Sequence, residues 1–206
     1  HDPAAARDDA ARQKLRERVD ALLAQPLSAD GAVELALLNN RGLQARLAGL
    51  GVVEAEAVRA GRLPNPMLHF GRISGGGDVE IERGLSFNLL ALLTLPTATR
   101  LGQERFAQAR VQAAADAVAL ADETRRAWVE AVASAELLAY SRQVQEAADV
   151  AAELARRMRQ AGHFSRLAQM REQAFLADAA AQLARAQHQA LADRERLTRL
   201  LGLYGE

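Results

Sequence analysis

The pattern of apolar and polar residues predicts helices in the first third of the chain. Residues 1–25 are mixed in charge and helical in propensity, and Pro26 ends that segment. Ser28 or Asp30 can cap a second helix, because a short side-chain oxygen accepts an otherwise unpaired backbone N–H group. We expect this helix to cover residues 32–62.

Beyond the two prolines of residues 64–66, which end the helix, apolar residues recur at every second position. Residues 79–89 alternate in this way, apart from one arginine, and predict a strand with one apolar and one polar face. Residues 68–71 alternate similarly, and the glycine-rich residues 74–78 suit the connection of a hairpin. Pro96 closes this region.

The last half of the chain has the periodicity of long helices that pack on one another. From Thr97 to Ala161 only one glycine interrupts the helical pattern, and this length exceeds what a compact domain accommodates. Gly162 breaks the pattern, and Ser165 can cap the next helix. The apolar rows at coiled-coil spacing comprise Val144, Ala148, Ala151, Ala155 and Met158, then Leu176, Leu183, Ala190, Leu197 and Tyr204, and finally Met170, Ala177, Ala184 and Leu191. We therefore predict an antiparallel helical hairpin with contacts on more than one side.

Composition and charge narrow the classes of function. More than a fifth of the 206 residues are alanine, and only 4% are aromatic, which favours closely packed helices over a globular core. The formal net charge of +0 provides no overall field for nucleic acid. With no cysteine there is no disulfide or thiolate site, and no apolar run approaches the roughly 20 residues of a membrane-spanning helix. A membrane role would then require a β-barrel or surface binding.

Four short motifs, in this order, resemble a known family. They are Ala36-Leu37-Leu38-Asn39-Asn40, Ala60-Gly61-Arg62-Leu63-Pro64-Asn65-Pro66, Ala161-Gly162-His163-Phe164-Ser165-Arg166-Leu167 and Leu200-Leu201-Gly202-Leu203. Their order and spacing resemble the first structural repeat of the TolC-like outer-membrane efflux channels, over residues 27–203.

The resemblance implies the fold class and the function. It implies a mainly α protein, with a long antiparallel coiled-coil hairpin, shorter helices and one β-hairpin that contributes to a membrane β-barrel. Family protomers carry two such repeats, and trimers form a passive duct for small molecules or ions through the periplasm and outer membrane. A periplasmic adaptor couples the duct to an inner-membrane transporter. The implied protein is no enzyme and needs no cofactor or metal.

The same comparison assigns the segments of the chain. Residues 1–30 form an N-terminal helical segment, residues 31–66 the first main helix and residues 67–96 the β-hairpin. Residues 97–206 form the long helical hairpin, with its turn at residues 161–166. The resemblance places the adaptor contact at that turn, and the residues it assigns to this tip are Gly162, His163, Phe164, Ser165, Arg166 and Leu167. The family often has an acidic residue after the leucine, whereas this chain has Ala168.

Alternation assigns two faces to the hairpin, since a membrane strand places apolar side chains toward lipid and polar ones toward the lumen. The expected lipid-facing residues are Leu68, Phe70, Val79, Ile81, Leu85, Phe87 and Leu89. The expected lumen-facing residues are Glu80, Glu82, Ser86 and Asn88. Arg72 interrupts the apolar register and is expected near the rim. An edge hairpin that covers a helical bundle would alternate in the same way.

Several features admit a second interpretation. One hairpin cannot close a barrel, so the chain is expected to be the first half of a longer protein, the alternative being an assembly of six copies. The chain begins at His1 and not at Met, as expected after removal of a leader peptide or trimming of the sequence. The arginines near the turn either dock a partner or complement the helix dipole. Glu80 and Glu82 lack a neighbouring nucleophile for acid–base catalysis, and the histidines lack metal-ligand spacing. The alternative function is a soluble periplasmic coiled-coil interaction protein.

Overall fold

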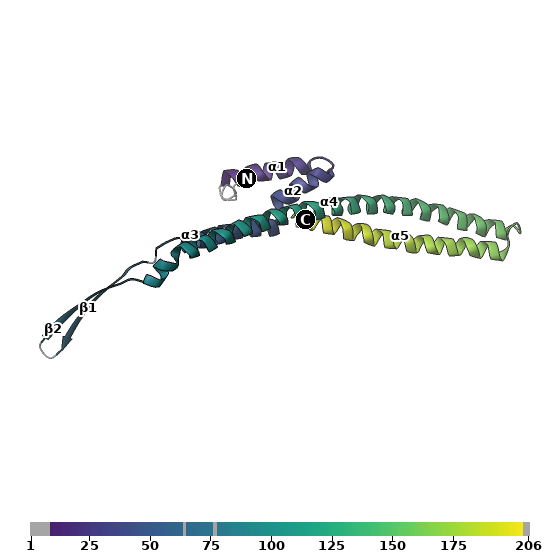
Figure 1. Cartoon of the computed structure of the whole chain (residues 1–206). Helices are drawn as coiled ribbons and strands as arrows, with labels where there is room; N and C mark the ends of the chain where they lie inside the picture. Colours follow the sequence, from purple (N-terminus) through teal and green to yellow (C-terminus); the bar gives the residue numbers. More distant parts are fainter. Residues whose placement is uncertain (1–8, 64, 76–77, 204–206) are drawn as a thin grey trace. The chain divides into compact units, whose positions relative to one another are not determined.

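A computed structural model describes residues 9–63, 65–75 and 78–203 and confirms the mainly helical class with one β-hairpin (Figure 1). Residues 44–116 form one compact unit, and the described residues on either side of them form a second. The elements, in chain order, are α1 (Asp9–Leu23), α2 (Ala29–Asn39), α3 (Arg41–Ala60), β1 (Met67–Gly75), β2 (Asp78–Ser86), α4 (Leu89–Gln160) and α5 (Arg166–Leu200).

The core of the unit that contains both ends of the chain forms around α2. Ser28 caps this helix, as the sequence predicts, because its side chain accepts a hydrogen bond from the Gly31 N–H at 3.1 Å. Leu35 is fully buried, and the indole of Trp128 donates a 2.8 Å hydrogen bond to the Leu27 carbonyl. The core is completed by buried Ala32, Ala36 and Leu201 and by the partly buried Val19, Leu22, Leu120, Leu197 and Leu203.

In the same unit, the C-terminal part of α4 packs antiparallel to α5 through small side chains. Buried positions on α4 recur every seven residues, and α5 contributes two buried alanines with the same spacing. Arg196 of α5 spans the pair, 2.8 Å from Glu130 and 3.5 Å from Glu123. Small side chains allow a close approach of the two helices. Their antiparallel packing confirms the predicted helical hairpin. The buried residues of these two rows are Ala127, Ser134, Ser141, Ala148 and Ala155 on α4 and Ala179 and Ala186 on α5.

The turn between α4 and α5 has the two devices that its sequence predicts. Gly162 has a φ of 79°, and the His163 N–H donates to the Met158 carbonyl at 2.9 Å, as in a Schellman motif. Ser165 then caps α5 by accepting a 3.1 Å hydrogen bond from the Ala168 N–H. The chain reverses within the predicted range of residues 161–166.

In the unit of residues 44–116, α3 lies against the first part of α4. A Cβ atom at Gly102 would lie 3.2 Å from Ala57 and Ala60, so the glycine permits the close approach of the two helices. Further along, Arg46 pairs with Asp116 at 3.0 Å. Hydrogen bonds from Gln112 and then Arg46 lower the pKa of the Asp116 carboxyl. These contacts position the helices that lead into and out of the β-hairpin.

The structure differs from the sequence-based prediction of one uninterrupted first helix. Asn40, in extended conformation, separates α2 from α3. Its side chain accepts a 3.0 Å hydrogen bond from the Leu43 N–H and donates another to the carbonyl of Leu200, at the end of α5. Asn39 donates to the carbonyls of Leu201 and Gly202, both at 3.0 Å. The break therefore supplies partners to the unpaired carbonyls at the end of α5.

A second difference lies at the end of the hairpin. The predicted extension of the strand through Phe87 and Asn88 to Leu89 is wrong, because β2 ends at Ser86 and α4 begins at Leu89. Asn88 caps this helix by accepting a 3.0 Å hydrogen bond from the Ala91 N–H. Pro96, expected to close the strand region, lies inside α4.

None of the helices in the described part of the chain combines the length and apolar character that a membrane crossing would require.

Candidate functional site: the β-hairpin and the helical turn

The register of the hairpin brings the predicted apolar residues of the two strands to one face. Leu68 pairs with Leu85, and Arg72 pairs with Ile81. Phe70 lies opposite Arg83, whose guanidinium carbon is 5.8 Å from the centre of the phenyl ring. Directly opposed residues of an antiparallel pair share a face, so this face is apolar with an arginine from each strand.

The polar residues expected toward a lumen fall on the opposite face of the hairpin. Met67 pairs with Ser86, and Gly71 pairs with Glu82. His69 belongs to this face, and its Nε2 atom lies 3.9 Å from Oε2 of Glu82. The side chains of two further predicted residues, Val79 and Glu80, lie outside the described part of the structure.

Apolar side chains of the β-hairpin are much more exposed to solvent than the side chains of a folded core. Leu68 is 81% exposed and Phe70 71%, while Ile81 and Leu85 are 52% and 56% exposed. Isolated exposed apolar residues are ordinary, but a contiguous apolar face marks a surface that contacts something other than water.

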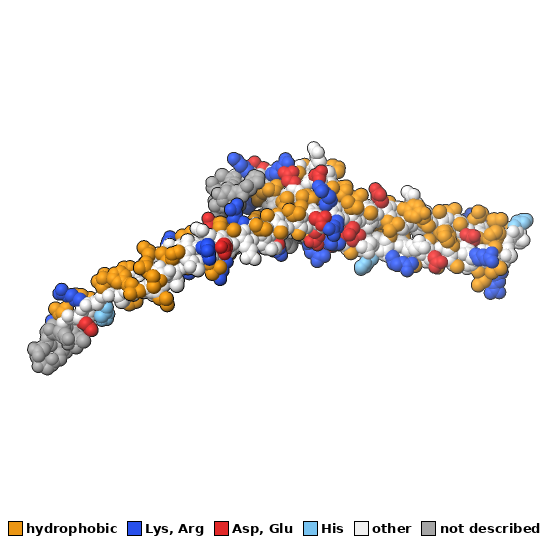
Figure 2. Space-filling model, in the orientation of Figure 1, with side chains coloured by type: hydrophobic (Ala, Val, Ile, Leu, Met, Phe, Trp, Pro, Cys, Tyr) orange, Lys and Arg blue, Asp and Glu red, His pale blue; other side chains and the backbone are white. Residues whose placement is uncertain are grey.

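The exposed apolar surface continues past the strand into the first turns of α4. Figure 2 shows hydrophobic side chains gathered where this helix leaves the hairpin. Sequence reasoning placed Phe87 and Leu89 on the apolar face of a strand but missed the leucines that follow them, because it predicted no helix in this segment. The helical spacing of its leucines, at i, i+1, i+3 and i+4, was the available signal. The residues are Phe87, Leu89, Leu90, Leu92 and Leu93, which are between 49% and 79% exposed.

At the other predicted site, the turn residues lie together between α4 and α5. Phe164 is half-buried and Leu167 is 61% exposed, so only the leucine presents a large apolar surface. The predicted residues of the turn are thus adjacent in space, although their contact with a partner stays a prediction.

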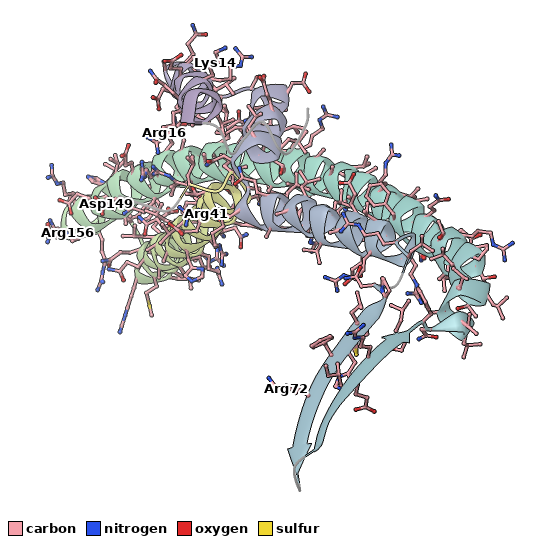
Figure 3. The ribbon with its side chains drawn as sticks, turned by 90° about the vertical axis from the view of Figure 1, so that its left-hand side faces the viewer. Lys14, Arg16, Arg41, Arg72, Asp149 and Arg156 are labelled. Atoms are coloured by element: carbon pink, nitrogen blue, oxygen red, sulfur yellow. The ribbon has the colours of Figure 1, made fainter. Side chains whose placement is uncertain are left out.

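Arginines of α4 near the turn have partners within the helical hairpin of α4 and α5. One of them, Arg156, is labelled in Figure 3. Arg156 and Arg157 both lie 2.7 Å from the carboxylate of Glu153. Hydrogen bonds from these two side chains lower the pKa of Glu153 to about 2. Arg159 donates to the side chain of Gln169 across the hairpin. The α4 arginines therefore contribute to local structure.

Solved structures share the fold of this chain. A membrane protein from Pseudomonas aeruginosa aligns with a TM-score of 0.71 at 24% identity, covering 84% of this chain and 44% of that one. CusC, which forms a transmembrane channel, aligns with a TM-score of 0.72 at 16% identity, covering 86% of this chain and 44% of that one. The CmeC outer membrane channel of Campylobacter jejuni aligns with a TM-score of 0.72 at 17% identity, covering 84% of this chain and 40% of that one.

These likenesses confirm the resemblance at the level of the fold. The chain spans less than half the length of the solved structures that it matches. Its fold corresponds to part of the TolC-like outer-membrane channels. No family profile and no curated protein matches the sequence.

Proposed function

We propose that this chain forms part of an outer-membrane efflux duct, a passive exit path for small molecules or ions. In this proposal the β-hairpin contributes to a closed membrane barrel, and α4 and α5 contribute to a helical tube in the periplasm. The exported substrate crosses without chemical change, and no residue acts as a catalyst.

The observation that carries the proposal is the two-faced hairpin. Its register places Leu68, Phe70, Ile81 and Leu85 on one face, with Arg72 and Arg83, and it places His69, Glu82 and Ser86 on the other, with Met67. A barrel strand in a membrane needs this division, because one face contacts lipid and the other contacts water. The exposure of Leu68 and Phe70 is then explained by lipid that covers them.

The assembly follows from the cost of an unpaired strand edge in hydrocarbon. Two strands leave two open edges, so the hairpin must pair with others. We infer that the natural protomer has a second repeat of this kind, and that three protomers close a barrel of about 12 strands, within the range known for such barrels.

Two partners complete the proposed system. The turn from Gly162 to Leu167 is placed at the periplasmic end of the tube, where it meets an adaptor protein. The adaptor connects the duct to an inner-membrane transporter, which supplies the energy. Support for this placement comes from the chain order, because α4 begins directly after the β-hairpin and ends at the turn.

The experiment compares two neighbouring strand residues on opposite faces of the hairpin. Leu85→Arg places a charge on the apolar face, and the matched control Ser86→Arg places the same charge on the polar face. Arginine on the lipid face near the midplane costs about 2–4 kcal/mol, while the water-filled interior tolerates charge. The intact gene product is separated by membrane fractionation, followed by extraction with high salt.

We expect the parent protein and Ser86→Arg in the salt-resistant outer-membrane fraction, and Leu85→Arg depleted from it. Equal membrane levels of the two variants would contradict the assignment of faces. Recovery of the parent protein in the soluble periplasm would instead favour a coiled-coil interaction protein, in which the hairpin covers helices.

A further inference from the structure

The residues around the α4–α5 turn carry positive charge, and only part of it is paired with other side chains of the helical hairpin. Residues 153–172 contain five arginines and two glutamates, a formal net charge of +3 in a chain whose overall charge is +0. Figure 2 shows Lys and Arg side chains gathered at this end of the molecule. Some of these arginines stabilise the helices themselves, and others do not.

Helix electrostatics accounts for the arginines of α4. Arg157 and Arg159 lie in the last turn of the helix, where a cation complements the partial negative charge of the unpaired carbonyls. Arg156 and Arg157 also pair with Glu153, and Arg159 with Gln169. These three side chains stabilise the hairpin without any external ligand.

By the same reasoning, the first arginine of α5 lies at an unfavourable position. Arg166 is the first residue of this helix, at the end where the dipole is positive, and its first turn contains no acidic residue. A cation is unfavourable at that position. No hydrogen bond or ion pair is seen for the side chains of Arg166 or Arg171 anywhere in the described ranges. Their charges are therefore left over after the local structure is satisfied.

Apolar side chains lie beside these two arginines. Met170 is one helical turn from Arg166, and Arg171 is one turn from Leu167, so the four residues form two adjacent rows on α5. Leu167 is 61% exposed and Met170 54% exposed. We call these four residues the tip surface.

We propose that the tip surface binds an acidic amphipathic helix of a partner protein. Carboxylates of the partner pair with the guanidinium groups of Arg166 and Arg171, which are suited to bidentate contacts, and its apolar residues cover Leu167 and Met170. Nucleic acid fits less well, because Leu167 and Met170 offer no aromatic ring on which a base could stack, and Phe164 of the adjacent turn is half-buried. The proposal rests on the proposed function and adds the charge of the partner.

The test uses two fluorescent helical peptides of equal length and equal leucine content, one with glutamates and one with lysines at its polar positions. Binding to the purified chain is measured by fluorescence anisotropy at low and high salt. The variant is R166E/R171E, and the control R185E reverses an exposed charge on the same helix away from the turn.

We expect the chain to prefer the glutamate peptide, and salt to weaken that binding. The double variant should bind this peptide about tenfold more weakly, while R185E should bind as the parent chain does. Because R166E places an anion at a helix N-terminus, thermal stability should be retained or raised, so lost binding is not lost folding. R166Q/R171Q, measured in parallel, removes the charge without reversing it and should give an intermediate loss.

Equal binding of the two peptides, or an equal loss with R185E, would overturn the proposal. So would a preference of the tip surface for single-stranded DNA or anionic vesicles over the glutamate peptide. The assay needs neither membrane insertion nor conduction, so it fails independently of the proposed duct. In the fractionation experiment, R166E/R171E should stay in the outer membrane whether or not it binds the acidic helix.

Discussion

Replacement of Gly202 by alanine tests the contact between the end of α5 and the α2–α3 break. Gly202 has a φ of 69°, which costs a residue with a Cβ atom about 1–2 kcal/mol. The new Cβ would also lie 2.4 Å from the Asn39 carbonyl oxygen and 2.8 Å from its carbon, and both are backbone atoms. Overpacking of this kind adds about 1–3 kcal/mol, so the expected destabilisation is about 2–5 kcal/mol.

Gly162 provides the matched control for this substitution. Its φ of 79° imposes the same conformational cost, but a Cβ there would meet no atom within 4 Å. Gly162→Ala should therefore cost only about 1–2 kcal/mol. The free energy of unfolding of both variants is measured by urea denaturation, with circular dichroism at 222 nm as the signal. An equal loss of stability in the two variants, or a larger loss at Gly162, would refute the packing of Asn39 against Gly202.

Three further predictions concern single side chains and use the same unfolding assay. Thr124 is fully buried, and its hydroxyl has no hydrogen-bond partner among the residues that the structure describes, so Thr124→Val should stabilise the chain by about 1 kcal/mol, whereas a loss would show that the hydroxyl is paired. The pKa of Glu153 is lowered in the folded chain, so its stabilising effect is present above the unfolded value of 4.5 and is lost as the pH falls toward about 2. Glu153→Gln should remove this dependence, and an unchanged pH profile would contradict it. Asn39→Asp removes the donors to the carbonyls of Leu201 and Gly202 and places an anion at the negative end of α5, which should cost about 2 kcal/mol and more than Asn39→Ala.

Features that depend on neighbouring residues could be predicted from the sequence. Ser28 and Ser165 cap their helices because each bonds to an N–H three residues ahead, and Gly162 ends α4 because glycine adopts a positive φ at low cost. The two hairpin faces follow from alternation alone. Such features involve only a few consecutive residues, so their signals are complete within a short window.

The break at Asn40 could not be predicted in this way. From the sequence, residues 32–62 are predicted to form one continuous helix, and Asn40 is only a mild interruption by propensity. What fixes the break is a contact with Leu200, 160 residues away, whose carbonyl accepts from the Asn40 side chain. A tertiary contact thus overrides the local preference.

The boundary between β2 and α4 was missed for a different reason. Alternation continues past Ser86 to Leu89, so the pattern alone does not show where the strand ends. The decisive signal is Asn88, a residue favoured at helix N-caps, followed by leucines at helical spacing. Pro96 was a misleading stop signal, because it lies within α4 after the first turns.

The two apolar rows of α5 show what periodicity leaves open. Leu176, Leu183, Ala190 and Leu197 are half-buried in the structure, whereas Met170 and Leu191 of the second row are 54% and 62% exposed. Both rows repeat every seven residues, so the sequence cannot tell which one packs on α4. The exposed row contains no charged residue between these two positions, so an apolar helix matches it, unlike the charged partner proposed for the tip surface. In the proposed duct, neighbouring helices of the tube wall cover this apolar row, and the turn at the open end is left for a different protein.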